Sequence, residues 1–324
     1  MSSARELALE TLRLEQDDRV LTATYASPPL NFATTTFLRD LDRLTQAVDR
    51  DRSIGAVVLT GGVEGRFLTH ADPTELGGIA EMPHPELPMR AIEPGLRVLN
   101  VVLQLPGLAR AVERRGGALG KGLVWGFRWK RTILRMNRSG TVYLAAINGP
   151  AMGGGQEIAL ACDLRYAADT DRVRMGQIEV LAGLIPGGGG TQRLPGMLGT
   201  ARALEHMLEG SPIDAPKALE LGLVHRLVAE DQLLAETHAT AARLARRSPT
   251  AIAALKRSIY FGTRGRSLGR GLDMELAGFL AAGSTRAGRR VFSTFAAELE
   301  RLDETPFLAE TEAWVEGTKV DLTS

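Results

Sequence analysis

Residues 147–194 read INGPAMGGGQEIALACDLRYAADTDRVRMGQIEVLAGLIPGGGGTQRL. This stretch contains two glycine clusters, at 153–155 and 187–190, and two glutamates, Glu157 and Glu179, among apolar residues that can fold the clusters against each other. Two carboxylates in one apolar pocket push their pKa values apart, so that one can act as a base while the other holds a proton. The stretch therefore predicts acid/base machinery.

The residues around the first glycine cluster predict a strand, a turn and a helix. Residues 142–147 form a short apolar run that ends at Asn148-Gly149-Pro150, which is typical of a buried strand entering a turn. A compact helical run follows the glycines. The unpaired N–H groups at its start can hold an oxyanion, and the helix dipole there favours the ionised form of Glu157. Taken alone, Glu157 is more typical of a simple N-terminal capping residue, and its context with Glu179 and the second glycine cluster favours the active-site interpretation.

Elements of both kinds alternate along the first half of the chain. Residues 20–25, 56–60 and 142–147 are strand-like, and the apolar spacing over 37–48 predicts a helix. This alternation predicts an α/β core. Beyond about residue 248 the sequence is helical, with its clearest apolar faces at 274–279 and 291–302.

Composition excludes several classes of protein. The 324 residues are 44% hydrophobic with a formal net charge of +1, which does not favour nucleic-acid binding. The single cysteine, Cys162, excludes an internal disulfide and is predicted to lie in the core. The histidines lack zinc-ligand spacing, and residues 187–190 lack the ending of a P-loop. With no recognisable signal, transit or bilayer-spanning segment, we expect a cytoplasmic protein.

The segment 147–194 resembles the signature of the crotonase superfamily, and most closely that of the enoyl-CoA hydratases. The resemblance extends over roughly residues 10–260, through 27–31, 67–72, 215–224 and 248–256. It implies a spiral of repeated ββα units over residues 1–210, interrupted by an insertion at about 81–121. Residues 211–324 are then expected to form a helical oligomerisation region of a homotrimer or dimer of trimers.

Carried over by residue, the resemblance implies a thioester site. The backbone N–H groups of Ala71 and Gly154 would form the oxyanion hole, and Glu157 and Glu179 would activate water and deliver a proton, respectively. Substrate-binding positions would include Thr69, His70 and Gly153. The substrate would be an acyl-CoA thioester, with no metal and no separate cofactor.

Residues 72–75, Asp-Pro-Thr-Glu, support this expectation because they predict a helix start directly after Ala71. Aspartate would be the N-cap, proline the first helical residue, and Glu75 would close a capping box.

Three departures from the family pattern concern the substrate. His70 stands where relatives have a glycine, so its side chain either intrudes on the acyl site, points away, or acts as a third acid/base group. Gln156 and Ile178 replace the residues usual beside the glutamates, and Asp171-Arg172 lengthens the loop between them.

The insertion at 81–121 is the largest departure. It begins with a proline-rich run at 82–88 that cannot continue a helix, followed by an apolar run at 96–105. Residues 123–136 then carry Trp125, Phe127 and Trp129. The insertion is either a lid or wall for a large acyl group or an added subunit-interface helix.

No acidic residue occurs between Glu113 and Glu157, while eight residues between them are basic: Arg114, Arg115, Lys121, Arg128, Lys130, Arg131, Arg135 and Arg138. Such a run could attract the phosphates of coenzyme A, although a solvated helix face is the more common explanation.

Three functions remain compatible with the sequence. An enoyl-CoA hydratase needs both glutamates, and a Δ3–Δ2 enoyl-CoA isomerase needs one to shuttle a proton. A non-catalytic CoA-binding scaffold needs neither. The presence of both favours hydration.

Overall fold

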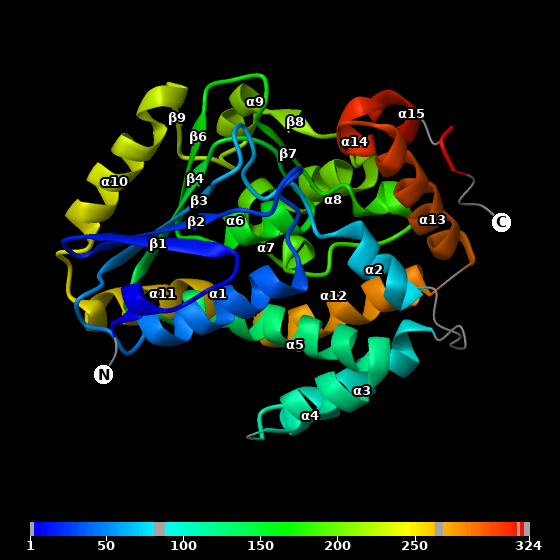
Figure 1. The fold of residues 1–324 in the computed structure, drawn as a ribbon, viewed down its shortest axis with the longest axis horizontal. Coiled ribbons are helices and arrows are strands. Elements are labelled where there is room, and N and C mark those ends of the chain that lie inside the picture. The colour runs from blue at the N-terminus through cyan, green and yellow to red at the C-terminus, as the bar shows by residue number, and fades with distance from the viewer. Residues whose placement is uncertain are drawn as a thin grey trace.

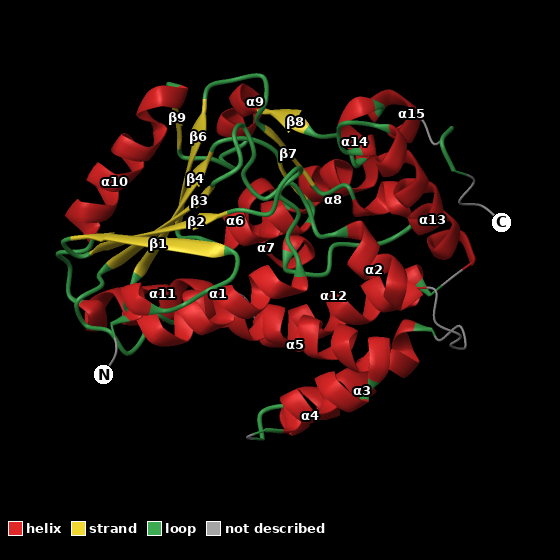
Figure 2. Ribbon diagram, in the orientation of Figure 1, coloured by secondary structure: helices red, strands yellow, loops and turns green. Residues whose placement is uncertain are grey.

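A computed structural model describes residues 3–80, 88–105, 107–262, 268–284, 286–315 and 318–320. The architecture is α/β, with two sheets, flanking helices and a helical C-terminal region (Figures 1 and 2). This confirms the predicted α/β class with a helical C-terminal region.

The main sheet has six strands in the order β1-β2-β3-β4-β6-β9. These strands are β1 (Leu12–Asp17), β2 (Val20–Tyr25), β3 (Ala56–Gly61), β4 (Val142–Ile147), β6 (Leu164–Ala168) and β9 (Arg226–Val228). Only β1 is antiparallel to its neighbour. Every residue of β4 is buried, as expected of a central parallel strand covered on both faces. The predicted strands 20–25 and 142–147 coincide with β2 and β4.

A small second sheet, β5-β7-β8, lies beside the first. Its strands are β5 (Ala151–Met152), β7 (Arg174–Gly176) and β8 (Ile213–Asp214). The chain passes from β4 to β5 and from β6 to β7, so successive turns of the spiral place one strand in each sheet. Because β9 lies beyond residue 210, the main sheet includes a strand from the region assigned to the C-terminal segment. The division at residue 210 stays a prediction.

The helices surround the sheets and build the C-terminal region. In the first half of the chain they are α1 (Thr35–Val48), α2 (Pro73–Ala80), α3 (Met89–Val102), α4 (Leu108–Arg115), α5 (Gly117–Met136) and α6 (Gly154–Ala161). The middle of the chain contributes α7 (Gly190–Leu198), α8 (Thr200–Glu209), α9 (Ala215–Glu220) and α10 (Leu233–Leu244). The tail consists of α11 (Pro249–Gly262), α12 (Leu268–Gly283), α13 (Arg286–Arg301), α14 (Pro306–Ala309) and α15 (Thr311–Val315). Short 3-10 helices are η1 (Ala4–Glu6), η2 (Glu179–Ala182) and η3 (Glu230–Gln232).

Helix α1 shows how sequence and packing agree. It begins at Thr35 because the Thr34 hydroxyl caps it, accepting a hydrogen bond from the Phe37 N–H at 3.1 Å. Its buried face carries Phe37, Leu38, Leu41, Leu44 and Val48, at the spacing that predicted the helix.

The insertion forms α3, α4 and the beginning of α5. Figure 1 shows α3 and α4 at the lower edge of the molecule, with α5 between them and the sheet. Residues 81–87, including His84 and most of the predicted proline break, lie outside the described residues. None of the described helices is long and apolar enough to span a membrane.

Candidate active site

A pocket of about 70 Å³, partly open to solvent, lies at the meeting point of the glycine-rich turns, α5 and the tail helices. Its lining includes Ala71, Gly153, Gly154, Glu157 and Glu179, so the structure brings together most of the predicted site residues. The strand ends behind the pocket are fixed by Asn148. Its side chain accepts from the Gly61 N–H at 3.2 Å and donates to the Gly61 carbonyl at 3.0 Å.

Ala71 and Gly154 line this pocket from different segments of the chain. The Ala33 N–H donates to the His70 carbonyl at 2.8 Å and the Asp72 N–H donates to the Ala33 carbonyl at 3.1 Å, which fixes the backbone on both sides of Ala71. A Cβ added to Gly154 would lie 3.6 Å from the Ala71 nitrogen, so the two segments approach closely. Across the described ranges, neither the Ala71 nor the Gly154 N–H donates to a protein acceptor.

Gly153 provides the turn that orients the second of these groups. Its φ of 48° lies in the region that favours glycine, and α6 begins at the next residue. The Gly154 N–H is therefore at a helix N-terminus, where partial positive charge accumulates. Gly153 also leaves room for the opposing carboxylate, because a Cβ there would lie 3.0 Å from Glu179 Oε1.

Glu157 is buried in the first turn of α6, with its side chain 2% exposed. Its Oε1 accepts from the Gly188 N–H at 2.7 Å and the Gly190 N–H at 2.9 Å. Burial nevertheless raises the pKa of Glu157 to about 7, against the opposing effects of the Gly190 and Gly188 N–H groups and the charge of Arg193. Desolvation thus outweighs the N–H groups and the helix dipole, which favour the ionised form.

Glu179 begins the 3-10 helix η2 and is partly buried on the wall of the same pocket. The segments that carry the two glutamates are joined by a hydrogen bond from Gln177 Nε2 to Gln156 Oε1 at 2.6 Å. Gln156, which the sequence showed as a departure from the family, thus links the two glycine-rich regions. Cys162, at the end of α6, is fully buried as predicted, and burial raises the pKa of its thiol to about 12.

His70 lies at the edge of the pocket in an aromatic setting. Its ring contacts Phe32, Phe295 and Phe307, with centroid separations of 4.5, 5.6 and 5.8 Å. Nδ1 lies 2.8 Å from the Ala71 carbonyl oxygen, so it donates, and Nε2 lies 2.9 Å from Thr305 Oγ1. Burial lowers the pKa of His70 to about 4. The imidazole is therefore neutral near pH 7, which does not favour the interpretation of His70 as a third acid/base group at that pH.

One sequence-based prediction around Ala71 needs correction and another stays a prediction. The Thr69 hydroxyl donates to the Leu30 carbonyl and is fully buried, so this side chain fixes the loop, and the substrate-binding role of Thr69 stays a prediction. Asp72 does cap α2, accepting from the Thr74 N–H at 2.8 Å. Glu75, however, does not close the capping box. Its carboxylate accepts from the N–H of Thr35 at 2.6 Å and from its hydroxyl at 3.1 Å, because the first turn of α1 lies beside α2.

Sequence reasoning missed two features of the pocket. The first is Trp129 of α5, whose Nε1 donates to the Gly188 carbonyl at 3.1 Å and fixes the second glycine-rich turn. The second is an aromatic wall from the tail, formed by Phe279, Phe292, Phe295 and Phe307. The separation of Trp125 and Trp129 by one helical turn was a usable signal for one face. Nothing local in the sequence pairs the tail with this pocket.

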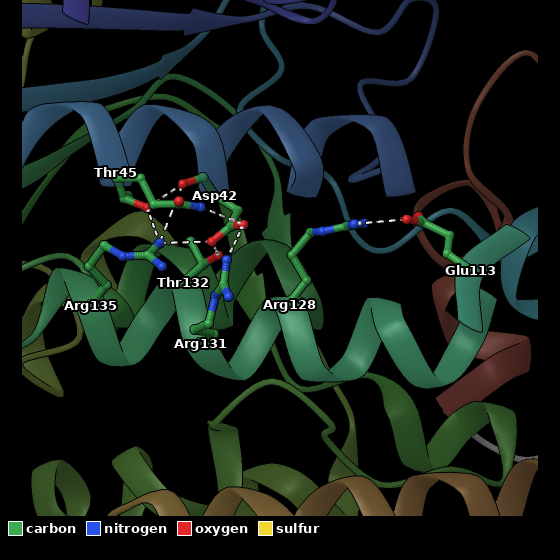
Figure 3. Close-up of polar contacts among 8 residues, drawn as sticks. Asp42, Thr45, Glu113, Arg128, Arg131, Thr132 and Arg135 are labelled. Atoms are coloured by element: carbon green, nitrogen blue, oxygen red, sulfur yellow. Dashed lines mark hydrogen bonds and ion pairs between the residues drawn. The ribbon is translucent and has the colours of Figure 1, made fainter. Parts of the chain in front are cut away.

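The basic side chains of α5 are largely engaged in ion pairs within the molecule. Figure 3 shows Arg131 and Arg135 directed at Asp42 of α1, at 3.0 and 2.7 Å, and Arg128 directed at Glu113, at 3.0 Å. Burial acts to raise the pKa of Asp42, but hydrogen bonding and charge from Arg135, followed by Arg131, outweigh it and lower that pKa. These arginines join helices. Arg114, Arg115 and Lys121 remain exposed.

Within the described residues, no group of three or more His, Cys, Asp and Glu side chains could hold a metal ion. The absence of a metal or separate cofactor from the reaction stays a prediction.

Comparisons with known proteins identify the family of this chain. The family model described as enoyl-CoA hydratase/isomerase matches residues 122–301, more than half of the chain. A "Probable enoyl-CoA hydratase" of Rhizobium meliloti (strain 1021) is 31% identical over 309 residues, covering 95% of this chain and 98% of that protein. The "Short-chain-enoyl-CoA hydratase" of Clostridium acetobutylicum is 30% identical, covering 79% and 83% of the two chains.

Among solved structures, the enoyl-CoA hydratase from Bacillus halodurans superposes with a TM-score of 0.71 at 20% identity, covering 88% of this chain and 99% of that one. This likeness shows the fold. Together, the α/β spiral and its two-carboxylate pocket define a crotonase-type enzyme. The chain belongs to the enoyl-CoA hydratase/isomerase family of the crotonase superfamily.

Proposed function

We propose that this protein hydrates trans-2-enoyl-CoA thioesters to 3-hydroxyacyl-CoA. The observation that carries the proposal is the placement of Glu157 and Glu179 on one pocket, beside the N–H groups of Ala71 and Gly154, which donate to no protein acceptor among the described residues. A thioester carbonyl placed between those N–H groups would gain negative charge during the reaction. Preorganised donors of this kind contribute about 3–4 kcal/mol each to transition-state stabilisation.

The reaction divides between the two carboxylates. Glu157 removes a proton from water as the water oxygen bonds to C3, and the electrons of the double bond move toward the thioester oxygen. Glu179 then delivers a proton to C2, which completes the addition of one water molecule. A pKa of about 7 suits Glu157 to this exchange near neutral pH. Proton transfer from Glu157 back to Glu179 restores the starting state.

Substitution of each glutamate by glutamine tests the proposal. Purified protein is mixed with crotonyl-CoA, and loss of the enoyl-thioester absorbance and product mass are followed. We expect water uptake by the unmodified protein, and roughly 10²–10⁴-fold lower kcat in Glu157→Gln and in Glu179→Gln. Circular dichroism provides the control for folding. Unchanged turnover in both variants would refute the assigned roles.

A 3-enoyl-CoA separates hydration from isomerisation. An isomerase moves the double bond without a mass change, and one carboxylate is sufficient to shuttle the proton. A hydratase adds the mass of water to crotonyl-CoA and needs both carboxylates. Inertness toward both substrates, with retained CoA-thioester binding, would instead indicate a non-catalytic scaffold.

The proposed assembly is a homotrimer or a dimer of trimers. The tail helices line this chain's own pocket through Phe279, Phe292 and Phe307, so the site is not formed solely by a neighbouring subunit. Light scattering of the purified protein measures the mass of the assembly. A monomer at working concentration would contradict this part of the proposal.

A further inference from the structure

An apolar groove of about 530 Å³, partly open to solvent, lies between α3, α5 and α12. Among the described residues, apolar side chains and glycines supply almost all of its lining, with Ser284 the exception. In Figure 1, α3 lies at the lower edge of the molecule below α5 and α12. The insertion therefore builds one wall of this groove.

The groove adjoins the active-site pocket. Leu76, Trp125, Phe279 and Phe292 line both spaces, so apolar side chains form the boundary between the pocket and the groove. A different hollow beside Ala71 is lined by the charged residues Asp72, Glu75 and Lys121, which do not suit a hydrocarbon chain. Polarity therefore distinguishes the groove from this hollow as a place for a hydrocarbon chain.

Helix α3 packs with a definite inner face. Leu96, 4% exposed, clusters with Leu276 and Ala277 of α12, while Val98 on the same helix is 65% exposed. Hydrogen bonds to one carboxylate join the three helices that form the groove. Asp273 of α12 accepts hydrogen bonds from Asn100 of α3 and from Lys130 of α5. The groove is thus held by side-chain contacts and does not depend on loose apposition of helices.

We propose that this groove binds the distal part of an extended apolar acyl chain, so that the substrate is a medium- or long-chain enoyl-CoA. The inference rests on the proposed function for its orientation, with the thioester at Ala71 and Gly154 and the chain directed past Trp125. The insertion is then the wall that extends the acyl site.

Binding of saturated acyl-CoAs tests the groove without catalysis. Affinities of the full-length protein for butyryl-CoA and lauroyl-CoA are measured by calorimetry. Each buried methylene contributes about 0.8 kcal/mol, which corresponds to roughly fourfold in affinity. Burial of four or more would make lauroyl-CoA bind more than about a hundredfold tighter. Equal affinities would overturn the proposal.

A matched pair of substitutions on α3 tests whether the acyl chain lies in the groove. Gly95 lies on the groove wall, and a Cβ there would meet nothing within 4 Å, so Gly95→Phe projects a ring into open space. Val98→Phe adds a ring to the exposed face of the same helix. We expect Gly95→Phe to lower the lauroyl-to-butyryl affinity ratio at least tenfold and Val98→Phe to leave it unchanged. Equal effects of the two variants would overturn the proposal.

Turnover separates this inference from the proposed function. The ratio of kcat/KM for trans-2-dodecenoyl-CoA to that for crotonyl-CoA should be high, and it should fall in Gly95→Phe. Hydration of crotonyl-CoA with no gain from the longer chain would refute the groove and leave hydration intact. Tighter lauroyl-CoA binding without hydration of either substrate would refute hydration and leave the groove intact.

Discussion

The segment 147–194 and the helices α3, α5 and α12 contribute to adjoining spaces by different means. The segment places backbone N–H groups and buried carboxylates, such as Glu157, within a few ångströms of each other. The helices present hydrocarbon side chains around a broad groove. Chemistry at the thioester needs fixed polar atoms, whereas accommodation of an acyl chain needs only apolar volume. The requirement for fixed polar atoms leaves a recognisable sequence motif, whereas the requirement for apolar volume does not.

The two regions meet at Gly188, where we expect the largest effect. A Cβ at this position would lie 2.2 Å from Trp129 Nε1 and 2.4 Å from Glu157 Oε2. Gly188→Ala should displace both groups and lower kcat/KM for crotonyl-CoA about a hundredfold or more. Gly269→Ala is the matched control, because its Cβ would meet its nearest neighbour, Lys130, at 3.8 Å. Similar kinetics in the two variants would show that close packing at Gly188 is unimportant.

The pH dependence of kcat/KM tests the segment 147–194 alone. With a pKa of about 7, Glu157 is mostly protonated below pH 7 and cannot accept a proton from water. We expect kcat/KM to fall about tenfold per pH unit below that value and to level off above it. Steady-state kinetics from pH 5 to 9 measure this fall in kcat/KM, and folding is checked at each pH. A flat profile down to pH 5 would contradict the base role.

The anchoring of α5 should matter for stability and little for chemistry. Asp42→Asn removes the carboxylate that Arg131 and Arg135 share, and we expect unfolding to become easier by about 1–3 kcal/mol. The folded-state pKa of Asp42 lies below its ordinary 3.8, so this stabilisation is present above that pH and is lost as pH falls further. Urea denaturation checks the value, with exposed Asp17→Asn as the control. A large loss of kcat in folded Asp42→Asn would contradict the separation of roles.

The smallest effect concerns the contact between the tail and the Ala71 loop. Thr305→Val removes the hydroxyl that bonds His70 Nε2, leaving a buried nitrogen without this partner, at a cost of about 1 kcal/mol in stability. Because His70 also holds the Ala71 carbonyl, kcat/KM should fall by up to about tenfold. Thermal unfolding and kinetics are compared with exposed Thr200→Val. No change in either measurement would show that the tail does not position the loop.

Local pattern was sufficient for the strands β2 and β4, for α1, and for the gathering of Glu157 and Glu179 on one pocket. Each depends on residues close in sequence or on a motif that glycine makes recognisable. The capping box at Glu75 failed because a neighbouring helix offered better donors. The interpretation of the basic run as an exposed helix face was wrong in part for the same reason. Arg135 of that run pairs with Asp42, which lies far away in sequence.

The sequence by itself determined the family, the α/β alternation and the identity of the acidic groups, because these follow from residue type at short spacing. Tertiary structure decided the protonation tendency of Glu157 and the neutral state of His70, because burial and distant partners control both. It also decided the groove. The residues of that groove, such as Leu96 and Leu276, become neighbours only when α3 folds onto α12, and their apolar character alone would suit any core.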